Sequence, residues 1–495
     1  MIRRRGWLGS DFRLHCLGRS ATLESSERGK ETMRKWVALV VAFAAGLGAW
    51  WLKAPAEETV ALARAGAAYK AKLLCSAVLA AGRDATAVLE GELGGADFAL
   101  VDTELAPPRV RAHALGFTRE AVFRPGLGCT LVPNAGDALS ADFDAPAIGP
   151  KPWPGGDLRE AEVAGLDRPA LNATLRDAFE EPGPERPRQT RAIVVLWRGG
   201  LLAERYAPGI DAQTPLLGWS MSKSLTNALV GMRVLDGALR LDGPVPLVGW
   251  GDDERGAITL DHLLRMSSGL AFTEHYDNFT SDVVSMLFGP AAIDTGGYAA
   301  RQPLAFAPDS HWSYASGTTN IVQKVLKESF PSKEAYWRYL YERLYAPLGM
   351  TDSFLEPDAS GTFVGSSFGY GSARDWARFG QLFLDDGVWA GQRLLPEGWV
   401  DYSTTPTPKA PYGSYGAHWW LNVGEPNDPT ARAFRSLPQD LYRASGFEGQ
   451  NVIIVPSHDL VVVRLGYTPD ERLAGIEALV RGVLDALPPQ EKELP

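Results

Sequence analysis

The chain has 495 residues, 45% of them apolar and 22% charged, so it can fold around a large core of more than one domain. Its formal net charge of -10, with no basic run beyond the N-terminus, argues against nucleic acid as a partner. It has three cysteines and seven histidines, without Cys-x-x-Cys or His-x-x-x-His spacing, so we expect no metal site. Neither of the common glycine-rich phosphate-binding motifs is present, and we expect no cofactor.

The first predicted element is an uncharged apolar segment at residues 36–52 that follows two basic residues. Such a segment is typical of export, and its length fits both a membrane anchor and a cleaved signal peptide. The basic residues keep the N-terminus in the cytoplasm, so the rest of the chain is expected in the periplasm or another extracytoplasmic space. Met33 is a plausible natural start. Residues 1–32 are therefore a disordered tail or a mis-assigned start, and residues 33–53 are the signal or anchor.

Residues 54–148 are predicted to form a small α+β region, because an alanine-rich helical stretch precedes short apolar runs typical of strands. Export would place Cys75 and Cys129 in an oxidising compartment, where a disulfide between them is expected. The alternative is two buried free thiols. A linker rich in proline and glycine follows at residues 149–159.

One large domain is predicted for residues 160–490. Residues 192–206 have the pattern of a hairpin turning at Gly199-Gly200, and residues 451–465 form a second apolar hairpin. Apolar spacing predicts helices at residues 316–327, 375–385 and 471–487. The economical architecture is an antiparallel sheet built from both ends of the domain, backed by terminal helices and capped by a helical middle.

The segment Ser220-Met221-Ser222-Lys223 carries the first catalytic pattern. Serine at i and lysine at i+3 share one face of a helix, which here is predicted to open at the serine. A serine hydroxyl is a poor nucleophile at neutral pH, and a desolvated lysine can accept its proton. By itself the pattern is also that of a helix cap beside a solvated lysine.

Three further segments follow Ser220-x-x-Lys223 in a fixed order, at residues 263–270, 312–320 and 444–450. Together they resemble the serine β-lactamase and penicillin-binding-protein superfamily. The similarity is to its class C-like branch, which includes esterases, D-aminopeptidases and the nylon-oligomer (6-aminohexanoate-dimer) hydrolases. The resemblance covers about residues 160–490. It implies an α+β, β-lactamase/transpeptidase-like fold with an antiparallel sheet flanked by helices and a helical subdomain.

The resemblance also implies roles for individual residues. Ser220 would be the acylated nucleophile, Lys223 would accept or relay its proton, and Tyr314 would match the tyrosine of the family's Tyr-x-Ser motif. We expect the lysine ammonium to stabilise the phenolate of Tyr314. Ser316 would hydrogen-bond near Lys223, and the backbone amides of Ser220 and Phe447 would form the oxyanion hole.

The third motif departs from the β-lactam-binding relatives, which carry Lys-Thr-Gly where this chain has Ala444-Ser445-Gly446. The lysine that binds a substrate carboxylate is missing, which puts β-lactam hydrolysis and D-Ala-D-Ala cleavage in doubt. Arg443 is a candidate replacement for it. Ser445 and Gly446 are expected to support the pocket, and Tyr370 is expected to reach the acyl site.

The predicted function is that of an exported serine hydrolase that cleaves an ester or amide bond through an acyl-enzyme, without a cofactor. The expected partner is a small-molecule ester, an amide or a peptide-like substrate, with the membrane as a second partner if residues 36–52 are not removed. One alternative is a β-lactamase or D-alanyl-D-alanine carboxypeptidase, and another is a non-catalytic, penicillin-binding-like ligand-binding module. Residues 274–277 are expected either to line the pocket entrance or to form a solvated loop.

Overall fold

The computed structural model describes residues 58–489 apart from 96–97, 135, 137–142, 155, 157–162 and 184–185. The predicted tail and export segment, residues 1–53, and part of the predicted linker lie outside the described residues. From Val60 onward, the described residues form one compact unit. In the described ranges, no helix is both long and apolar enough to span a bilayer.

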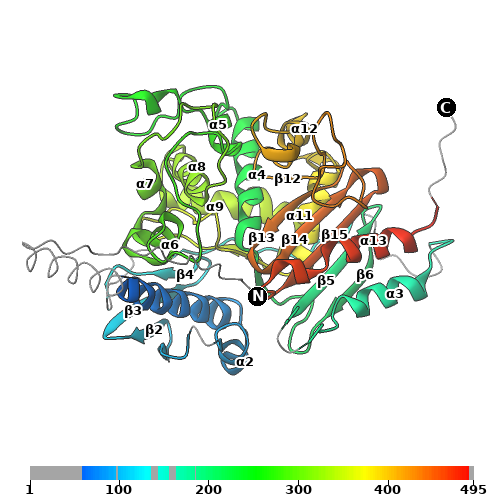
Figure 1. The fold of residues 1–495 in the computed structure, drawn as a ribbon, viewed down its shortest axis with the longest axis horizontal. Coiled ribbons are helices and arrows are strands. Elements are labelled where there is room, and N and C mark those ends of the chain that lie inside the picture. Colours follow the sequence, from blue (N-terminus) through cyan, green and yellow to red (C-terminus); the bar gives the residue numbers. More distant parts are fainter. Residues whose placement is uncertain are drawn as a thin grey trace, which may run out of the picture. The chain divides into compact units, whose positions relative to one another are not determined.

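The N-terminal region combines helices with a small antiparallel sheet (Figure 1). A helix at residues 58–75 continues into a π-helical turn, and the strands lie in the order β1-β2-β3-β4. Buried alanines of this helix pack with the buried residues of β2, and small side chains let the helix lie close to the sheet. A disulfide joins Cys75, at the end of the helix, to Cys129 in β4. The elements are η1 Ser76–Ala80, α2 Ala85–Glu90, β1 Asp102–Ala106, β2 Arg109–Ala114, β3 Phe117–Arg124 and β4 Gly128–Leu131.

The large domain is built on a six-stranded antiparallel sheet in the order β12-β13-β14-β15-β5-β6. Its strands come from both ends of the domain, with Val195 of β5 opposite Val462 of β15. The predicted α+β fold and both predicted hairpins are confirmed. The strands are β5 Thr190–Trp197, β6 Gly200–Tyr206, β12 Trp420–Leu421, β13 Tyr442–Gly446, β14 Gln450–Val455 and β15 Leu460–Gly466.

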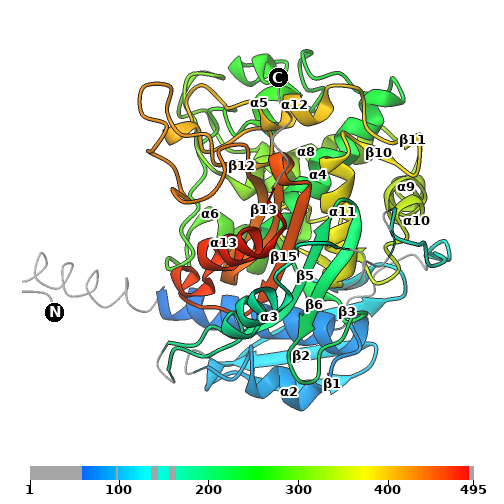
Figure 2. The ribbon, with the colours of Figure 1, turned by 90° about the vertical axis from the view of Figure 1, so that its right-hand side faces the viewer.

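The two faces of the sheet are covered by different helices because side chains alternate along each strand. Ile193 and Val195 of β5 pack with α3 Arg168–Asp177 and α13 Ile476–Ala486, which lie side by side (Figure 2). Val194 faces the other way, toward α11 Ala373–Leu384. The final helix begins later than predicted, because Gly475 takes a left-handed conformation at φ +69° after a separate 3-10 turn, η11 Glu471–Ala474.

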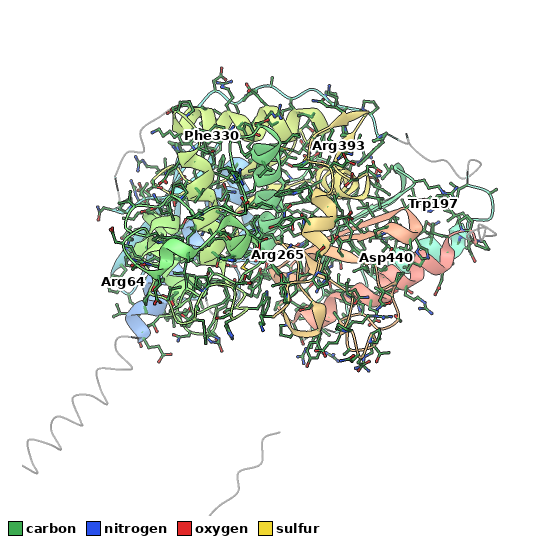
Figure 3. The ribbon with its side chains drawn as sticks, turned by 90° about the horizontal axis from the view of Figure 1, so that it is seen from above. Arg64, Trp197, Arg265, Phe330, Arg393 and Asp440 are labelled. Carbon is green, nitrogen blue, oxygen red and sulfur yellow. A yellow bond between two sulfur atoms is a disulfide. The ribbon has the colours of Figure 1, made fainter. Side chains whose placement is uncertain are left out.

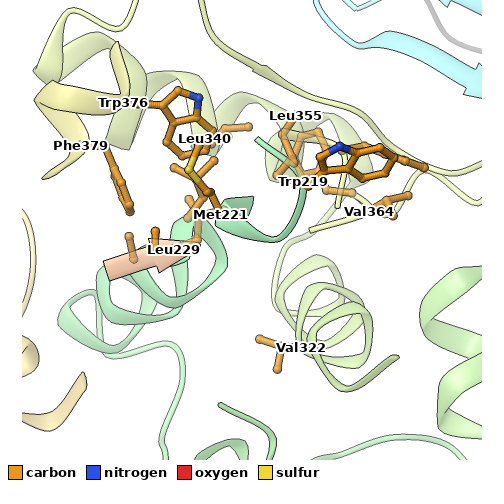
Figure 4. Packing of buried hydrophobic residues seen from close by; sticks show 14 of the residues in the cluster. Trp219, Met221, Leu229, Val322, Leu340, Leu355, Val364, Trp376 and Phe379 are labelled. Carbon is orange, nitrogen blue, oxygen red and sulfur yellow. The ribbon is translucent and has the colours of Figure 1, made fainter. Parts of the chain in front are cut away.

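In chain order, a helical subdomain is inserted between β6 and β12 of the sheet, and it includes the largely buried helix α4 Ser222–Leu235. Met221 and Leu229 pack near Trp376 and Phe379 of α11 (Figure 4). The remaining helices are α5 Leu260–Leu264, α6 Asp282–Phe288, α7 Thr295–Ala300, α8 Ser316–Glu328, α9 Lys333–Leu340, α10 Ala346–Leu348 and α12 Trp399–Thr404, and the short strands are β7 Leu216–Leu217, β8 Phe354–Leu355, β9 Gly369–Gly371, β10 Val388–Trp389 and β11 Gln392–Arg393. Helices α8 and α11 confirm the predictions for residues 316–327 and 375–385.

The N-terminal region packs against both other parts of this compact unit, since Lys72 pairs with Glu356 and Glu92 pairs with Arg191 of β5. Arg64 on the N-terminal helix and Trp197 at the end of β5 appear on opposite sides when the molecule is seen from above (Figure 3). In Figure 1 the N-terminal helix lies beneath the helical subdomain, and α4 runs along the border between that subdomain and the sheet. The start of α4 therefore lies where all three parts of the molecule can contribute side chains.

Candidate active site

Ser220 lies in a 3-10 turn, η4 Trp219–Met221, directly before α4, so the α-helix begins two residues after the serine at which the sequence predicted it to open. Trp219 has a left-handed backbone with φ +48°, which is uncommon for a bulky residue. The Ser222 hydroxyl donates to the Trp219 carbonyl at 2.6 Å and accepts the Gly369 N–H at 2.8 Å. These bonds fix the turn that presents Ser220.

Lys223 is the immediate neighbour of the Ser220 hydroxyl. Its Nζ lies 2.9 Å from Ser220 Oγ, 3.1 Å from Ser316 Oγ and 3.0 Å from the Ser366 carbonyl, which occupies all three donors of an ammonium. The side chain is only 2% exposed. Burial lowers the pKa of Lys223 to about 8, although the Glu274 carboxylate opposes part of that shift. A fraction of the lysine is therefore an uncharged base near neutral pH.

Tyr314 completes the group around the serine. Lys223 Nζ lies 4.8 Å from the centre of the Tyr314 ring, and the tyrosine hydroxyl is near enough to that of Ser220 for the serine to favour the phenolate slightly. Burial and the nearby Glu274 carboxylate raise the pKa of Tyr314 well above its ordinary value. Both effects favour the neutral phenol and oppose the expected stabilisation of a phenolate by Lys223. Tyr314 is a neutral phenol.

Glu274 anchors the other side of Lys223. The Ser316 hydroxyl donates to Glu274 Oε1 at 2.5 Å, and the Ser316 N–H, at the start of α8, donates to Oε2 at 2.8 Å. Tyr276 also donates to Glu274 at 2.8 Å, and its ring stacks on Phe447 at 5.8 Å. Glu274 and Tyr276 therefore border the site, and Ser316 links Lys223 to a carboxylate.

The end of strand β13 abuts the serine turn. A Cβ atom on Gly446 would lie 2.1 Å from the Gly218 carbonyl oxygen and 3.1 Å from the Ser220 nitrogen, so a side chain is excluded here. Phe447 follows Gly446 directly and is 38% exposed. The backbone of Phe447 is thus brought beside the backbone of Ser220.

The sequence model of the family described as Beta-lactamase matches residues 175–477, which is more than half of the chain. The chain belongs to the β-lactamase family. A curated relative, the 6-aminohexanoate-dimer hydrolase of Paenarthrobacter ureafaciens, is 25% identical over 331 residues, or 60% of this chain and 77% of the relative. The resemblance expected from the motifs is confirmed.

Two solved structures share the fold of this β-lactamase-family chain. A protein from Bacillus anthracis, named as a candidate 6-aminohexanoate-dimer hydrolase, superposes with a TM-score of 0.54 at 19% identity, over 70% of this chain and 91% of its own. A penicillin-binding-protein homologue from Caulobacter crescentus has a TM-score of 0.50 at 16% identity, over 66% of this chain and 99% of its own. These two similarities show the fold, and the family match with the curated relative makes the chain a β-lactamase-family hydrolase.

Tyr370, Arg443 and Ser445, which were expected in or near the acyl site, lie elsewhere. The hydroxyl of Tyr370 lies toward Ser76 of the N-terminal region, and its ring stacks on Phe354 at 4.7 Å, so it does not join the acyl site. Arg443 Nη1 donates to Ser445 Oγ at 2.9 Å and to Asn451 Oδ1 at 2.7 Å. Arg443, Ser445 and Asn451 line a cleft of about 750 Å³ beside α13, on the face of β13 opposite Ala444. Arg443 therefore does not take the place of the missing lysine.

His418 is a supporting residue that sequence reasoning did not assign. Its Nδ1–H donates to the Lys223 carbonyl at 3.1 Å, so its Nε2 accepts from the Thr319 hydroxyl at 3.2 Å. Burial and the Lys223 ammonium lower the pKa of His418 to about 3, and the ring is uncharged. His418 is 195 residues from Lys223, and no spacing in the sequence indicates the contact.

Over the described ranges, no cluster of three or more His, Cys, Asp or Glu side chains could hold a metal.

Proposed function

We propose that the protein is an exported serine hydrolase that cleaves an ester or amide bond through an acyl-enzyme on Ser220. The observation that carries this proposal is the 2.9 Å contact between Ser220 Oγ and Lys223 Nζ, with the lysine buried. A buried amine of lowered pKa beside a hydroxyl has the properties required of a general base for a serine nucleophile.

In acylation, the uncharged Lys223 amine accepts the Ser220 proton as Oγ bonds to the substrate carbonyl carbon. The backbone amides of Ser220 and Phe447 donate to the developing oxyanion. When the tetrahedral intermediate collapses, Tyr314 protonates the leaving alcohol or amine and regains a proton from the Lys223 ammonium. This assignment follows from the neutral state of Tyr314, which makes it a proton donor.

Deacylation repeats these transfers with water. Uncharged Lys223 takes a proton from the attacking water, whose oxygen bonds to the acyl carbon. The bond from that carbon to Ser220 Oγ then breaks, and the Lys223 ammonium returns a proton to Oγ. Ser316 holds Lys223 in reach throughout, because it accepts from Nζ and donates to Glu274.

Esters and linear amides are favoured over β-lactams as substrates. Ala444 offers no charge to a substrate carboxylate, and Arg443 faces a different cleft. The curated relative from Paenarthrobacter ureafaciens is named for hydrolysis of the 6-aminohexanoate dimer, which supports an amide substrate. Export is supported by the apolar segment at residues 36–52 and by the disulfide between Cys75 and Cys129, since disulfides persist in oxidising compartments.

The deciding experiment compares wild type with Ser220→Ala on a short-chain p-nitrophenyl ester and on a chromogenic cephalosporin. We expect ester turnover with an acylation burst in wild type, none in Ser220→Ala, and little cephalosporin hydrolysis. Ser310→Ala is the matched control, because Ser310 is exposed and bonds only with the nearby Ala307 carbonyl in the described structure. Preferential cephalosporin turnover would establish a β-lactamase, and silence on both substrates would support a binding module.

A further inference from the structure

The residue before the proposed nucleophile is in contact with a part of the chain outside the family match. The family match begins at residue 175, and the whole N-terminal region lies before that residue. Its Tyr69 stacks on the indole of Trp219 with ring centres 6.1 Å apart. Phe368 and Phe447 complete the ring of aromatic neighbours at 6.3 and 5.9 Å. Trp219 is thus held partly by the N-terminal region.

The helix that carries Tyr69 is held in place by two other residues of its own. Lys72, three residues later, lies 4.2 Å above the ring of Phe368 and forms a buried ion pair with Glu356. The disulfide at Cys75 closes the helix end against β4. Tyr69 therefore reaches Trp219 from a helix anchored one and two turns further along the chain.

A second contact, a hydrogen bond of the indole, also holds Trp219. Its Nε1–H donates to Glu448 Oε2 at 3.0 Å, and Glu448 is only 6% exposed. Glu448, like Trp219, has a left-handed backbone, at φ +65°. Its carbonyl accepts from the buried Arg464 at 3.2 Å, and its N–H donates to Glu471 at 3.2 Å. One hydrogen bond thus joins the two strained residues that flank Ser220 and Phe447.

Trp219 and Glu448 adjoin the two proposed oxyanion donors in the chain. The N–H of Ser220 belongs to the peptide group that Trp219 begins, so the backbone angles of Trp219 orient it. Glu448 follows Phe447 and fixes where the chain leaves β13. Left-handed conformations of bulky residues persist only where their surroundings impose them, and here Tyr69, Phe368 and Glu448 supply those surroundings.

We propose that the N-terminal region is part of the catalytic centre, with Tyr69 and Glu448 as positioning residues that hold Trp219 and, through it, the oxyanion amides of Ser220 and Phe447. The inference rests on the proposed function. Misplacement of reacting groups by about 1 Å can cost about a hundredfold in rate. Partial loosening of Trp219 should therefore lower kcat about tenfold, with little change in KM, because the amides act on the transition state.

The first test compares full-chain Tyr69→Ala, Tyr69→Phe and Phe117→Ala in p-nitrophenyl ester hydrolysis. Phe117 is the control, because it packs against Arg64 in the same region and, within the described structure, its ring does not contact Trp219. We expect kcat to fall about tenfold in Tyr69→Ala, with KM within about twofold of wild type, and both other variants to keep wild-type kcat. Equal losses in Tyr69→Ala and Phe117→Ala, or no loss in Tyr69→Ala, would overturn the proposal.

The second test acts on the hydrogen bond and does not depend on folding of the Tyr69 variants. Burial raises the pKa of Glu448 to about 8, so Glu448→Gln imitates its uncharged carboxyl and keeps an acceptor for Trp219. Glu448→Leu removes that acceptor. We expect Leu to lower kcat about tenfold and Gln to restore it. Equal activity of the Leu and Gln variants would refute the positioning role, whereas failure of wild type to turn over any ester or amide would refute the proposed function itself.

Discussion

Burial of Lys223 changes its chemistry from that of a permanent cation to that of a base. With its ordinary pKa, about one lysine in 3,000 would be uncharged at neutral pH, whereas a pKa of about 8 leaves roughly one in ten uncharged. The charged form donates to Ser220 Oγ, and the uncharged form can accept its proton. The 2.9 Å contact between Lys223 Nζ and Ser220 Oγ is therefore present in both the resting ammonium form and the reactive amine form, and pH sets their proportions.

The pH profile of ester hydrolysis should report this lysine. We expect kcat/KM to rise with pH through about 8 and then to level, because the uncharged amine is the reactive form. Lys223→Arg, which stays charged, should lose this limb and at least about a hundredfold in kcat/KM. Steady-state rates with a p-nitrophenyl ester, corrected with Ser220→Ala, would measure both. A flat wild-type profile from roughly pH 6 to 9 would exclude Lys223 as the base.

Glu274 should affect the pH at which kcat/KM rises. Its negative charge raises the pKa of Lys223 against the effect of burial, so Glu274→Gln should move the limb to lower pH by about 0.5 to 1 unit. Gln keeps one acceptor for Ser316 and so limits structural loss. Asp277→Asn removes one charge from the same loop at an exposed position, and its profile should match wild type. A limb that stays in place in Glu274→Gln would show that the carboxylate does not act on the lysine.

At the scale of elements, the junction between β13 and the serine turn depends on one glycine. Gly446→Ala would place Cβ 2.1 Å from the Gly218 carbonyl oxygen, and because the obstacle is backbone, the strand end must move away from Ser220. We expect kcat to fall at least about a hundredfold while the sheet still folds. Gly251→Ala, with open space around its Cβ, is the control. Thermal melting and ester kinetics on both variants would separate loss of the site from loss of the fold.

Patterns within elements predicted more than contacts between elements. Continuous apolar runs predicted both hairpins of the sheet, because β5, β14 and β15 are buried on two faces by different helices. Ser220, Lys223 and Tyr314 came from motifs, and the structure places them together. Glu448, by contrast, bonds with Trp219 from 229 residues away, and only the folded chain reveals such a partner. Arg443 was misjudged because the motif did not indicate the face of β13 on which its side chain lies.

At the scale of the whole molecule, the buried pair of Lys72 and Glu356 holds the N-terminal helix against the large domain. Both side chains are at most 1% exposed, and Glu356 also accepts from Ser76 and the Cys129 N–H. Lys72→Met would leave an uncompensated buried carboxylate and should lower the free energy of unfolding by about 3 to 5 kcal/mol.

A double variant tests the origin of that loss. Lys72→Met with Glu356→Leu removes both charges and should recover most of the stability in chemical denaturation. Arg240→Met, which removes an exposed partner of Asp242, should leave stability within error. If the double variant were no more stable than Lys72→Met, the loss would come from packing of the lysine chain and not from the unpaired charge.

The disulfide between Cys75 and Cys129 links the same helix to β4 across 54 residues of sequence. A loop of that length is worth about 4 kcal/mol through restriction of the unfolded chain, so Cys75→Ala/Cys129→Ala should lower the free energy of unfolding by about that amount. Guanidinium unfolding of native, reduced and double-variant protein would measure it. Reduced protein and the double variant should unfold at the same, lower denaturant concentration. Because the N-terminal helix carries Tyr69, both should also lose ester turnover before they lose the central sheet, and activity that persists up to global unfolding would show that this helix does not support the site.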